Sequence, residues 1–238
     1  MQRAKLQLNF GEILDSIDDL HPNKDPLKLA FYSLEKRGKF AEIFLHEFDE
    51  CLRDHKIPME RAGLRITDPG RIFDNRTYYE AYGFAMIQNM HAALDAFPFI
   101  VFMMLGPMGR SAIQTGKYIS ITPKSCAWSS SFLAAVEETF PSERSVLQLL
   151  TDFQQSKHFL ILQNMVNRSK HQSLIRILND GENVVFEDAE YFDKGKNGTI
   201  KIRDIHARNF MRDASNELFP ALFAMVVALQ EARVRLSK

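Results

Sequence analysis

The chain has 238 residues, of which 45% are hydrophobic and 25% are charged, as in ordinary folded globular proteins. Thirty Lys and Arg balance thirty Asp and Glu, so the molecule as a whole has no electrostatic attraction to nucleic acid or to an acidic membrane. These values exclude a largely disordered chain and a uniformly basic nucleic-acid-coating protein, but they leave room for a local basic patch.

The first predicted element is a long helix. An Asp-Pro pair at 25–26 is typical of a helix start, because the carboxylate caps the first turn and proline suits the first helical position. Apolar residues then recur at helical spacing, which predicts a helix over about 26–55 after an N-terminal extension over 1–24. Residues 58–74 are predicted to form a loop, since they contain Pro58, Gly63, Pro69 and Gly70.

A second long helix is predicted to begin at Asn75, whose side chain can cap it. Pro98 is expected to kink this helix, because proline removes one backbone hydrogen bond and clashes with the preceding turn. The helix should stop at Gly106, which is followed by Pro and a second Gly. Residues 106–125 are then expected to be irregular, with a short strand at 118–122.

The rest of the chain is predicted to be helical with one β-rich interruption. A helix is expected over about 127–139, and a further helical pattern with a bend over 142–171. Alternating β-rich segments separated by the turn sequence DKGKNG predict a β-hairpin insertion over 183–203. The last helix is expected over about 207–236, interrupted or kinked at Pro220.

Together these patterns predict a mainly α protein, an irregular bundle of about five or six helices with a small β-hairpin insertion, in a single domain over 1–238. The apolar runs at 97–105 and 218–229 are shorter than the roughly 20 residues that a membrane span needs, so no membrane association is expected. Without a secretory signal, the expected location is the cytoplasm. Cys51 and Cys126 are expected to be free and buried as small hydrophobic residues.

The common catalytic and metal-binding motifs are absent from the sequence. Gly116-Lys117 is followed by tyrosine and not by Ser or Thr, so it does not form a phosphate-binding loop. There is no Gly-x-Ser-x-Gly elbow, no His-Glu-x-x-His, and no Glu-x-x-His pair of the kind that holds a di-iron site in a helical bundle. No cofactor and no metal are therefore expected.

A polar stripe interrupts the second predicted helix. Gln88, His91 and Asp95 stand three and four residues apart, so they share one face of an otherwise apolar helix. A carboxylate one turn from an imidazole can orient or charge it, which would suit an acid–base pair in a small-molecule enzyme. The alternative is an interhelical hydrogen-bond cluster or simply the solvent face.

The segment 163–171 combines polar groups that suit phosphate chemistry. Asn164, Asn167, Arg168 and His171 fall on one face of the predicted helix. Arginine can hold a phosphate with two hydrogen bonds, and histidine can move a proton near neutral pH, so the pair would suit metal-free cleavage of RNA. The alternative is a solvated helix end, where basic residues satisfy free carbonyls and the helix dipole.

Several of these features together resemble the HEPN-like helical superfamily. They are the long helix ending in Asn-x-x-Lys-His (167–171), the Ser-Leu-Ile that follows, the β-rich insertion and the final helix, over about 75–236. The resemblance implies a bacterial protein of defence or toxin type that binds RNA or cleaves it without a metal. It also implies a homodimer, with Arg168 and His171 as catalytic residues and Lys170 at the binding site.

An alternative function is a non-enzymatic helical binding or scaffold module with a structural polar cluster. Only two residues separate Arg168 from His171, whereas active HEPN nucleases have four to six between Arg and His, and this difference favours the alternative. Because asparagine is a poor helix former, Asn167, Lys170 or His171 is expected to face another helix or a second subunit. The expected partners are the stripe at 88–95 or the β-insertion.

Overall fold

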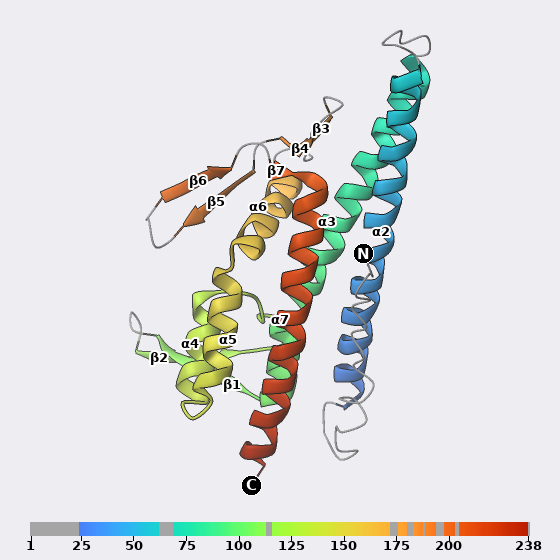
Figure 1. Ribbon diagram of the computed structural model, residues 1–238. Helices are drawn as coiled ribbons and strands as arrows, with labels where there is room; N and C mark the ends of the chain where they lie inside the picture. Colours follow the sequence, from blue (N-terminus) through green and yellow to red (C-terminus); the bar gives the residue numbers. More distant parts are fainter. Residues whose placement is uncertain are drawn as a thin grey trace. The chain divides into compact units, whose positions relative to one another are not determined.

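The computed structural model describes residues 24–61, 69–112, 116–171, 176–179, 183–187, 189–193, 198–202 and 205–237 (Figure 1). The protein is mainly helical and carries small antiparallel strand pairs, which confirms the predicted fold class. The described residues form two compact units. The first unit takes them from 24–37, 92–156 and 218–237, and the second unit from 38–91 and 157–217. The single domain expected over 1–238 stays a prediction.

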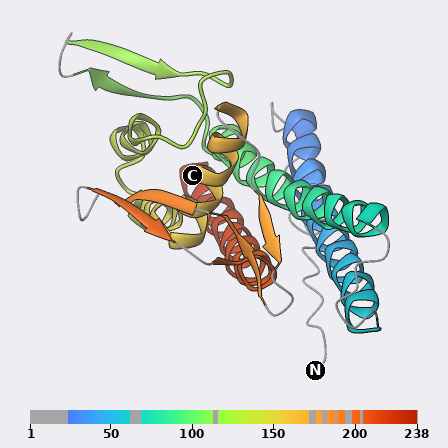
Figure 2. The same cartoon turned by 90° about the horizontal axis from the view of Figure 1, so that it is seen from above.

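Three long helices contribute a segment to each unit. They are α2 (Lys24–Arg61), α3 (Pro69–Leu105) and α7 (Ala207–Leu236). The bounds of α7 agree with those predicted from the apolar spacing, and the helix runs through Pro220. The segments of α2 and α3 in the second unit lie side by side (Figures 1 and 2), and the rings of Phe48 and Tyr79 meet edge to face at 6.2 Å.

The predicted loop over 58–74 is wrong at both ends. Helix α2 continues through Pro58 to Arg61, because one proline removes only a single backbone hydrogen bond from a helix of 38 residues. Helix α3 begins at Pro69, the position where the missing N–H of proline costs nothing. Asn75 therefore lies inside α3 and does not cap it. Residues 62–68, and 1–23 of the predicted N-terminal extension, lie outside the described residues.

The first unit contains two short helices and a β-hairpin. Helix α4 (Ser130–Thr139) is capped by the Ser129 side chain, which accepts a hydrogen bond from the Phe132 N–H, and α5 (Arg144–Gln155) follows after a short turn. Strand β1 (Met108–Ala112) pairs antiparallel with β2 (Lys117–Ile121), and β1 packs against α4.

The predicted irregular segment over 106–125 is wrong for β1, whose sequence MGRSA has little β-propensity. Tertiary contacts hold this strand in place. The Thr139 hydroxyl bonds both the N–H and the C=O of Gly109, and the Glu138 carboxylate accepts from the Ser111 N–H at 2.7 Å. Gly109 is required because a Cβ there would clash with the Tyr118 ring of β2.

Helix α3 runs through Pro98 because a distant side chain replaces the hydrogen bond that proline removes. Pro98 has no N–H to donate to the carbonyl of Leu94, four residues earlier. The indole Nε1 of Trp128 donates to that carbonyl at 2.7 Å. The Trp128 ring also stacks on Phe97 and packs against two further phenylalanine rings of the core. Trp128 therefore supplies the hydrogen bond that the α3 backbone lacks, and its ring lies at the centre of the aromatic core of the first unit.

The second unit contains α6 (Lys157–His171) and two small sheets. Strands β3 (Ile177–Asn179), β4 (Val184–Phe186) and β7 (Ile205–His206) form an antiparallel sheet in the order β3-β4-β7. Strands β5 (Ala189–Asp193) and β6 (Gly198–Ile202) form a separate antiparallel pair, and β5 packs against α6.

The predicted hairpin over 183–203 is wrong in part. It holds only for β5 and β6, because β4 pairs with strands on both sides in the other sheet. Residues 194–197 of its turn lie outside the described residues. In the helical pattern predicted with a bend over 142–171, the chain breaks at Ser156, whose extended backbone separates α5 from α6.

Gly83 of α3 allows three elements of the second unit to pack closely. A Cβ at this position would lie 2.8 Å from Cδ1 of Ile177 in β3 and 3.3 Å from the ring of Phe48 in α2. Both of those side chains are fully buried. The missing side chain of Gly83 therefore lets the three-stranded sheet approach α2 and α3.

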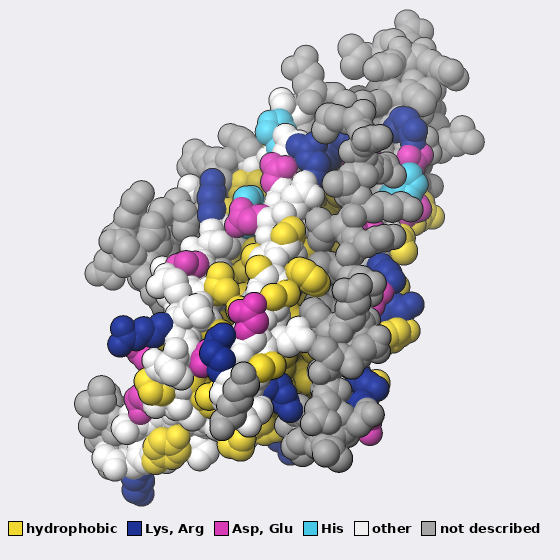
Figure 3. Space-filling model, turned by 60° about the horizontal axis from the view of Figure 1, so that its bottom comes forward, with side chains coloured by type: hydrophobic (Ala, Val, Ile, Leu, Met, Phe, Trp, Pro, Cys, Tyr) yellow, Lys and Arg dark blue, Asp and Glu magenta, His cyan; other side chains and the backbone are white. Residues whose placement is uncertain are grey.

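None of the helices in the described part of the chain has a stretch long and apolar enough to cross a membrane. Cys51 and Cys126 are not joined in a disulfide, and each is half-buried where full burial was expected. Burial raises the pKa of the Cys126 thiol to about 11, which makes this thiol a poor nucleophile at neutral pH. On the face shown in Figure 3, acidic, basic and hydrophobic side chains are interspersed.

Candidate functional site at the start of helix α6

The residues predicted at 164–171 form the C-terminal half of α6. Asn164 and Arg168 are half-buried, and Asn167, Lys170 and His171 are exposed. Within this chain, the expectation that one of the last three faces another helix is therefore not met, and a second subunit remains the untested alternative. The exposed positions leave the last turn of α6 accessible to a ligand.

The predicted stripe on α3 does not share one environment. Gln88 is half-buried, His91 is buried and Asp95 is exposed. Gln88 Nε2 donates to the hydroxyl of Ser169 on α6 at 3.1 Å, and that hydroxyl donates to the Val166 carbonyl at 2.8 Å. The stripe and the α6 segment are thus joined, but through Ser169, which the sequence pattern did not single out. This contact supports a structural role for Gln88.

One face of α6 links the predicted residues to the other end of the helix. Lys157, Ile161, Asn164, Arg168 and His171 follow one another at spacings of four, three, four and three residues. At 3.6 residues per turn they fall within about 80° of the helix circumference. We call this row the α6 stripe. Lys170 lies on roughly the opposite side of the helix from the centre of the stripe.

A small pocket lies at the N-terminal end of the α6 stripe. Its volume is about 190 Å³, and it is bounded by α6, β7 and α7. The lining residues include Lys157, His158, Ile161, His206, Asn209 and Phe210. We call it the α6 pocket. None of these residues belongs to a site predicted from the sequence.

A carboxylate orients one of the two imidazoles in the α6 pocket. His158 Nδ1 lies 2.5 Å from the carboxylate of Glu217 on α7, and the His158 ring packs 5.7 Å from the ring of Phe210. Because Nδ1 is held by Glu217, the other ring nitrogen of His158, Nε2, is the one left for a ligand. His206, the second imidazole, is exposed and lies in β7, in register with Val185 of β4.

The backbone adds positive potential at the same place. The pocket contains first-turn residues of both α6 and α7, and the N-terminus of a helix carries a partial positive charge. Neither helix has an acidic residue in its first turn to offset that charge. Arg208, also in the first turn of α7, is already paired with Asp49 of α2 at 2.8 Å. Lys157 forms no ion pair with any residue whose side chain the structure describes.

The arrangement is suited to an anion and to proton transfer, and it lacks the features of a metal site. Among the described residues, no group of three or more His, Cys, Asp or Glu side chains is placed to hold a metal ion. One cation, two imidazoles and two helix N-termini around a small pocket are instead the groups that recognise a phosphate.

Comparisons with known proteins do not assign this chain to a family. No protein-family model, no curated protein and no solved structure matches this chain.

Proposed function

We propose that this protein binds single-stranded RNA along the α6 stripe, with one phosphate in the α6 pocket. The observation that carries the proposal is the pocket itself, where Lys157, His158 and His206 meet at two helix N-termini. Cations at the positive end of a helix are unfavourable by themselves, and a bound phosphate would relieve both the side-chain and the helix charges.

The size of the α6 pocket supports a phosphate group as its occupant. A volume of about 190 Å³ is more than a single water molecule needs, and it leaves room for a phosphate with its hydrogen-bond partners. In a bound nucleic acid, one phosphate would lie in the pocket and the chain would continue outside it.

The α6 stripe supports a polymer as the ligand. Lys157 and His171 are 14 residues apart, so the stripe is about 21 Å long. Its ends are exposed, Ile161 is buried, and the half-buried Asn164 and Arg168 carry an amide and a positive charge. A chain of phosphates can follow such a row, whereas a single small anion would use only the pocket. The resemblance to HEPN-like proteins favours RNA as the polymer.

The stripe can be tested against the opposite side of the same helix. We expect Lys157→Gln and Arg168→Gln each to weaken binding of a fluorescent single-stranded RNA by about tenfold, equivalent to ~1.4 kcal/mol. Each variant should also lower the salt dependence of binding, by a slope of about 0.7 for each phosphate that the protein no longer neutralises. Fluorescence anisotropy over a range of salt concentrations measures both quantities.

Lys170→Gln is the matched control, because it removes one exposed charge from the same helix but off the stripe. Its affinity should remain close to that of the wild type. Equal losses from Lys157→Gln and Lys170→Gln would mean that only the overall charge of α6 matters and would contradict the stripe. Absence of RNA binding at low salt would overturn the proposed function itself.

A second candidate, metal-free cleavage of the bound RNA, is favoured by the His158–Glu217 hydrogen bond. In this proposal His158 Nε2 takes the proton of a ribose 2′-hydroxyl, and the 2′-oxygen attacks the adjacent phosphorus. The bond from phosphorus to the 5′-oxygen breaks, and His206 gives that oxygen a proton. The products are a 2′,3′-cyclic phosphate and a 5′-hydroxyl, and Lys157 stabilises the charge on the phosphoryl oxygens.

We expect His158→Gln to lower the cleavage rate by about 10²- to 10⁴-fold, the usual contribution of a general base, while RNA binding is retained. Glu217→Gln should lower the rate less, because it disturbs the orientation of the imidazole but leaves the imidazole in place. Gel analysis of end-labelled RNA in the presence of EDTA measures the rate, and 2′-deoxy RNA is the control that should bind without being cut. Cleavage that persists in His158→Gln, or that needs a metal, would contradict this candidate.

Binding without cleavage would instead support the non-enzymatic module. In that case the Gln88–Ser169 hydrogen bond supplies a structural role for Gln88 in the polar stripe of α3.

From the resemblance we also propose a role of the defence or toxin type and a homodimer that pairs through α6. Asn167, Lys170 and His171 are exposed in the single chain and are available for such a contact.

A further inference from the structure

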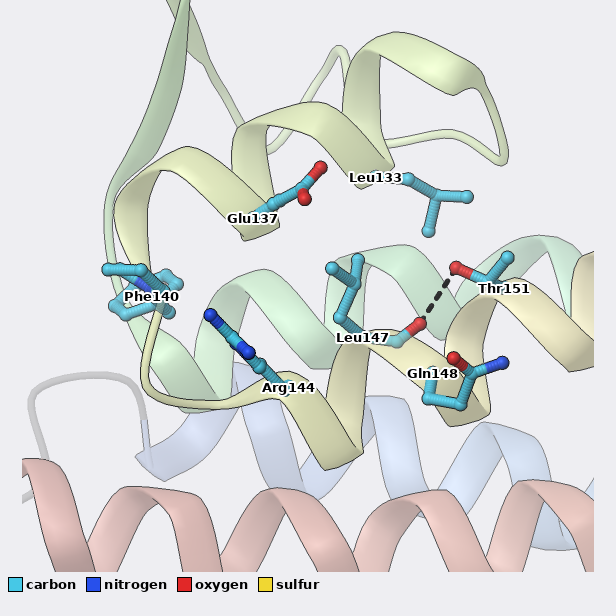
Figure 4. Close-up of a pocket in the computed structure, with 8 residues that line it drawn as sticks. Leu133, Glu137, Phe140, Arg144, Leu147, Gln148 and Thr151 are labelled. Atoms are coloured by element: carbon cyan, nitrogen blue, oxygen red, sulfur yellow. Dashed lines mark hydrogen bonds between the residues drawn. The ribbon is translucent and has the colours of Figure 1, made fainter.

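A second groove lies in the first unit, between α4 and α5 (Figure 4). Its volume is about 470 Å³, within the roughly 300–1,000 Å³ of small-molecule sites. Leu133 and Leu147 form apolar walls, and Phe140 lies at the end where the chain turns from α4 to α5. The groove is formed by two consecutive helices joined by a short turn, so its walls are held close together by the chain itself.

Two opposite charges line this groove without pairing. The Glu137 carboxylate comes from the last turn of α4, and the Arg144 guanidinium from the first residue of α5. Both are exposed, and neither forms an ion pair with the other or with any other described residue. An apolar wall with a carboxylate on one side and a guanidinium on the other is complementary to a molecule that carries an ammonium, a carboxylate and an apolar group.

The helix ends strengthen the same pattern of charge. The C-terminus of α4 carries a partial negative charge, and α4 has no basic residue in its last turn to offset it. The N-terminus of α5 carries a partial positive charge, and α5 has no acidic residue in its first turn. Glu143, which precedes α5, is already bonded to Arg235. An ammonium beside Glu137 and a carboxylate beside Arg144 would therefore be stabilised by both a side chain and a helix end.

We infer that the groove between α4 and α5 binds a free amino acid with an apolar side chain. Its ammonium would contact Glu137, its carboxylate would contact Arg144, and its side chain would lie against Leu133 and Leu147. This site belongs to the first unit and is independent of the proposed RNA function, whose residues all belong to the second unit.

The test is calorimetric titration of the protein with leucine and three analogues that each lack one recognised group. We expect leucine to bind, and glycine, N-acetylleucine and leucinamide to bind at least tenfold more weakly. Glu137→Gln should weaken leucine by about tenfold but leave N-acetylleucine unchanged, since that analogue has no ammonium. Arg144→Gln should weaken leucine and N-acetylleucine alike but leave leucinamide unchanged.

Glu231→Gln and Lys124→Gln are the matched controls, because they neutralise exposed charges of the first unit outside the groove, and both should bind leucine as the wild type does. Absence of leucine binding at millimolar concentration would overturn the inference. So would equal binding of leucine and its two blocked analogues, because recognition would then not depend on both charges.

Discussion

Replacing Trp128 with alanine is expected to lower the free energy of unfolding by about 3–5 kcal/mol, the usual range for removing a buried tryptophan. The ring is 8% exposed and contacts three phenylalanines, Phe97, Phe132 and Phe153, with ring centroids 5.4 to 6.4 Å apart. The substitution also removes the donor that bonds the Leu94 carbonyl at 2.7 Å. Urea unfolding followed by circular dichroism measures the loss.

A double-mutant cycle separates the hydrogen bond from the packing. Trp128→Phe keeps an aromatic ring but leaves the Leu94 carbonyl without its donor, which should cost about 1–3 kcal/mol. In the Trp128→Phe background, Pro98→Ala should recover part of that loss, because alanine restores a backbone N–H that can bond the Leu94 carbonyl as in a regular helix. In the wild-type background the same substitution should stabilise the protein less, because the Trp128 indole already donates a hydrogen bond to that carbonyl.

The recovery is the informative outcome of this cycle. If Pro98→Ala changes stability equally in both backgrounds, the two residues are not coupled, and Trp128 does not replace the missing backbone hydrogen bond. A loss from Trp128→Ala below about 1 kcal/mol would contradict the central place of this ring in the core of the first unit.

Replacing Arg235 with glutamine is expected to destabilise the protein at neutral pH, because it leaves the carboxylate of Glu143 without its cation. The Glu143 side chain is 3% exposed, and Arg235 donates to it at 2.6 Å from the last turn of α7. Arg235 itself is half-exposed, so this loss should be smaller than for a fully buried ion pair.

The same pair predicts how stability changes with pH. The hydrogen bond from Arg235 holds the pKa of Glu143 below its ordinary value of 4.5. A carboxyl with a lowered pKa in the folded state contributes stability above its ordinary pKa, and that contribution is lost as the pH falls through the lowered value. The difference in unfolding free energy between the wild type and Glu143→Gln should therefore be constant near neutrality and shrink below about pH 4.5.

Fluorescence of Trp128, the single tryptophan of the chain, reports unfolding of the first unit in these variants. Glu231→Gln serves as the control, because its exposed carboxylate lies 4.0 Å from Arg235 and should change stability by no more than about 0.5 kcal/mol. A difference that grows as the pH falls from 7 to 4 would show that Glu143 is not stabilised as a carboxylate.

The sequence by itself determined most of the helices, because helical periodicity is a local property of the backbone. The apolar spacing that leads to α7 places its ends at 207 and 236, where the structure has them. The β-rich composition around residues 183–203 likewise predicts strands there, since alternation follows from strand geometry alone. The fold class follows from these local patterns, and the structure confirms it.

Only the tertiary structure decided how a proline is accommodated inside a helix and which polar groups meet. The sequence predicts a kink at Pro98, but it does not reveal that Trp128, 34 residues away from Leu94 in the chain, supplies the missing donor. His158 and Glu217 are 59 residues apart, and no spacing rule connects them. A hydrogen bond between distant residues depends on which helix faces pack together. The α6 pocket could therefore be found only in the folded structure, whereas the row of polar residues from Asn164 to His171 could be predicted from the sequence.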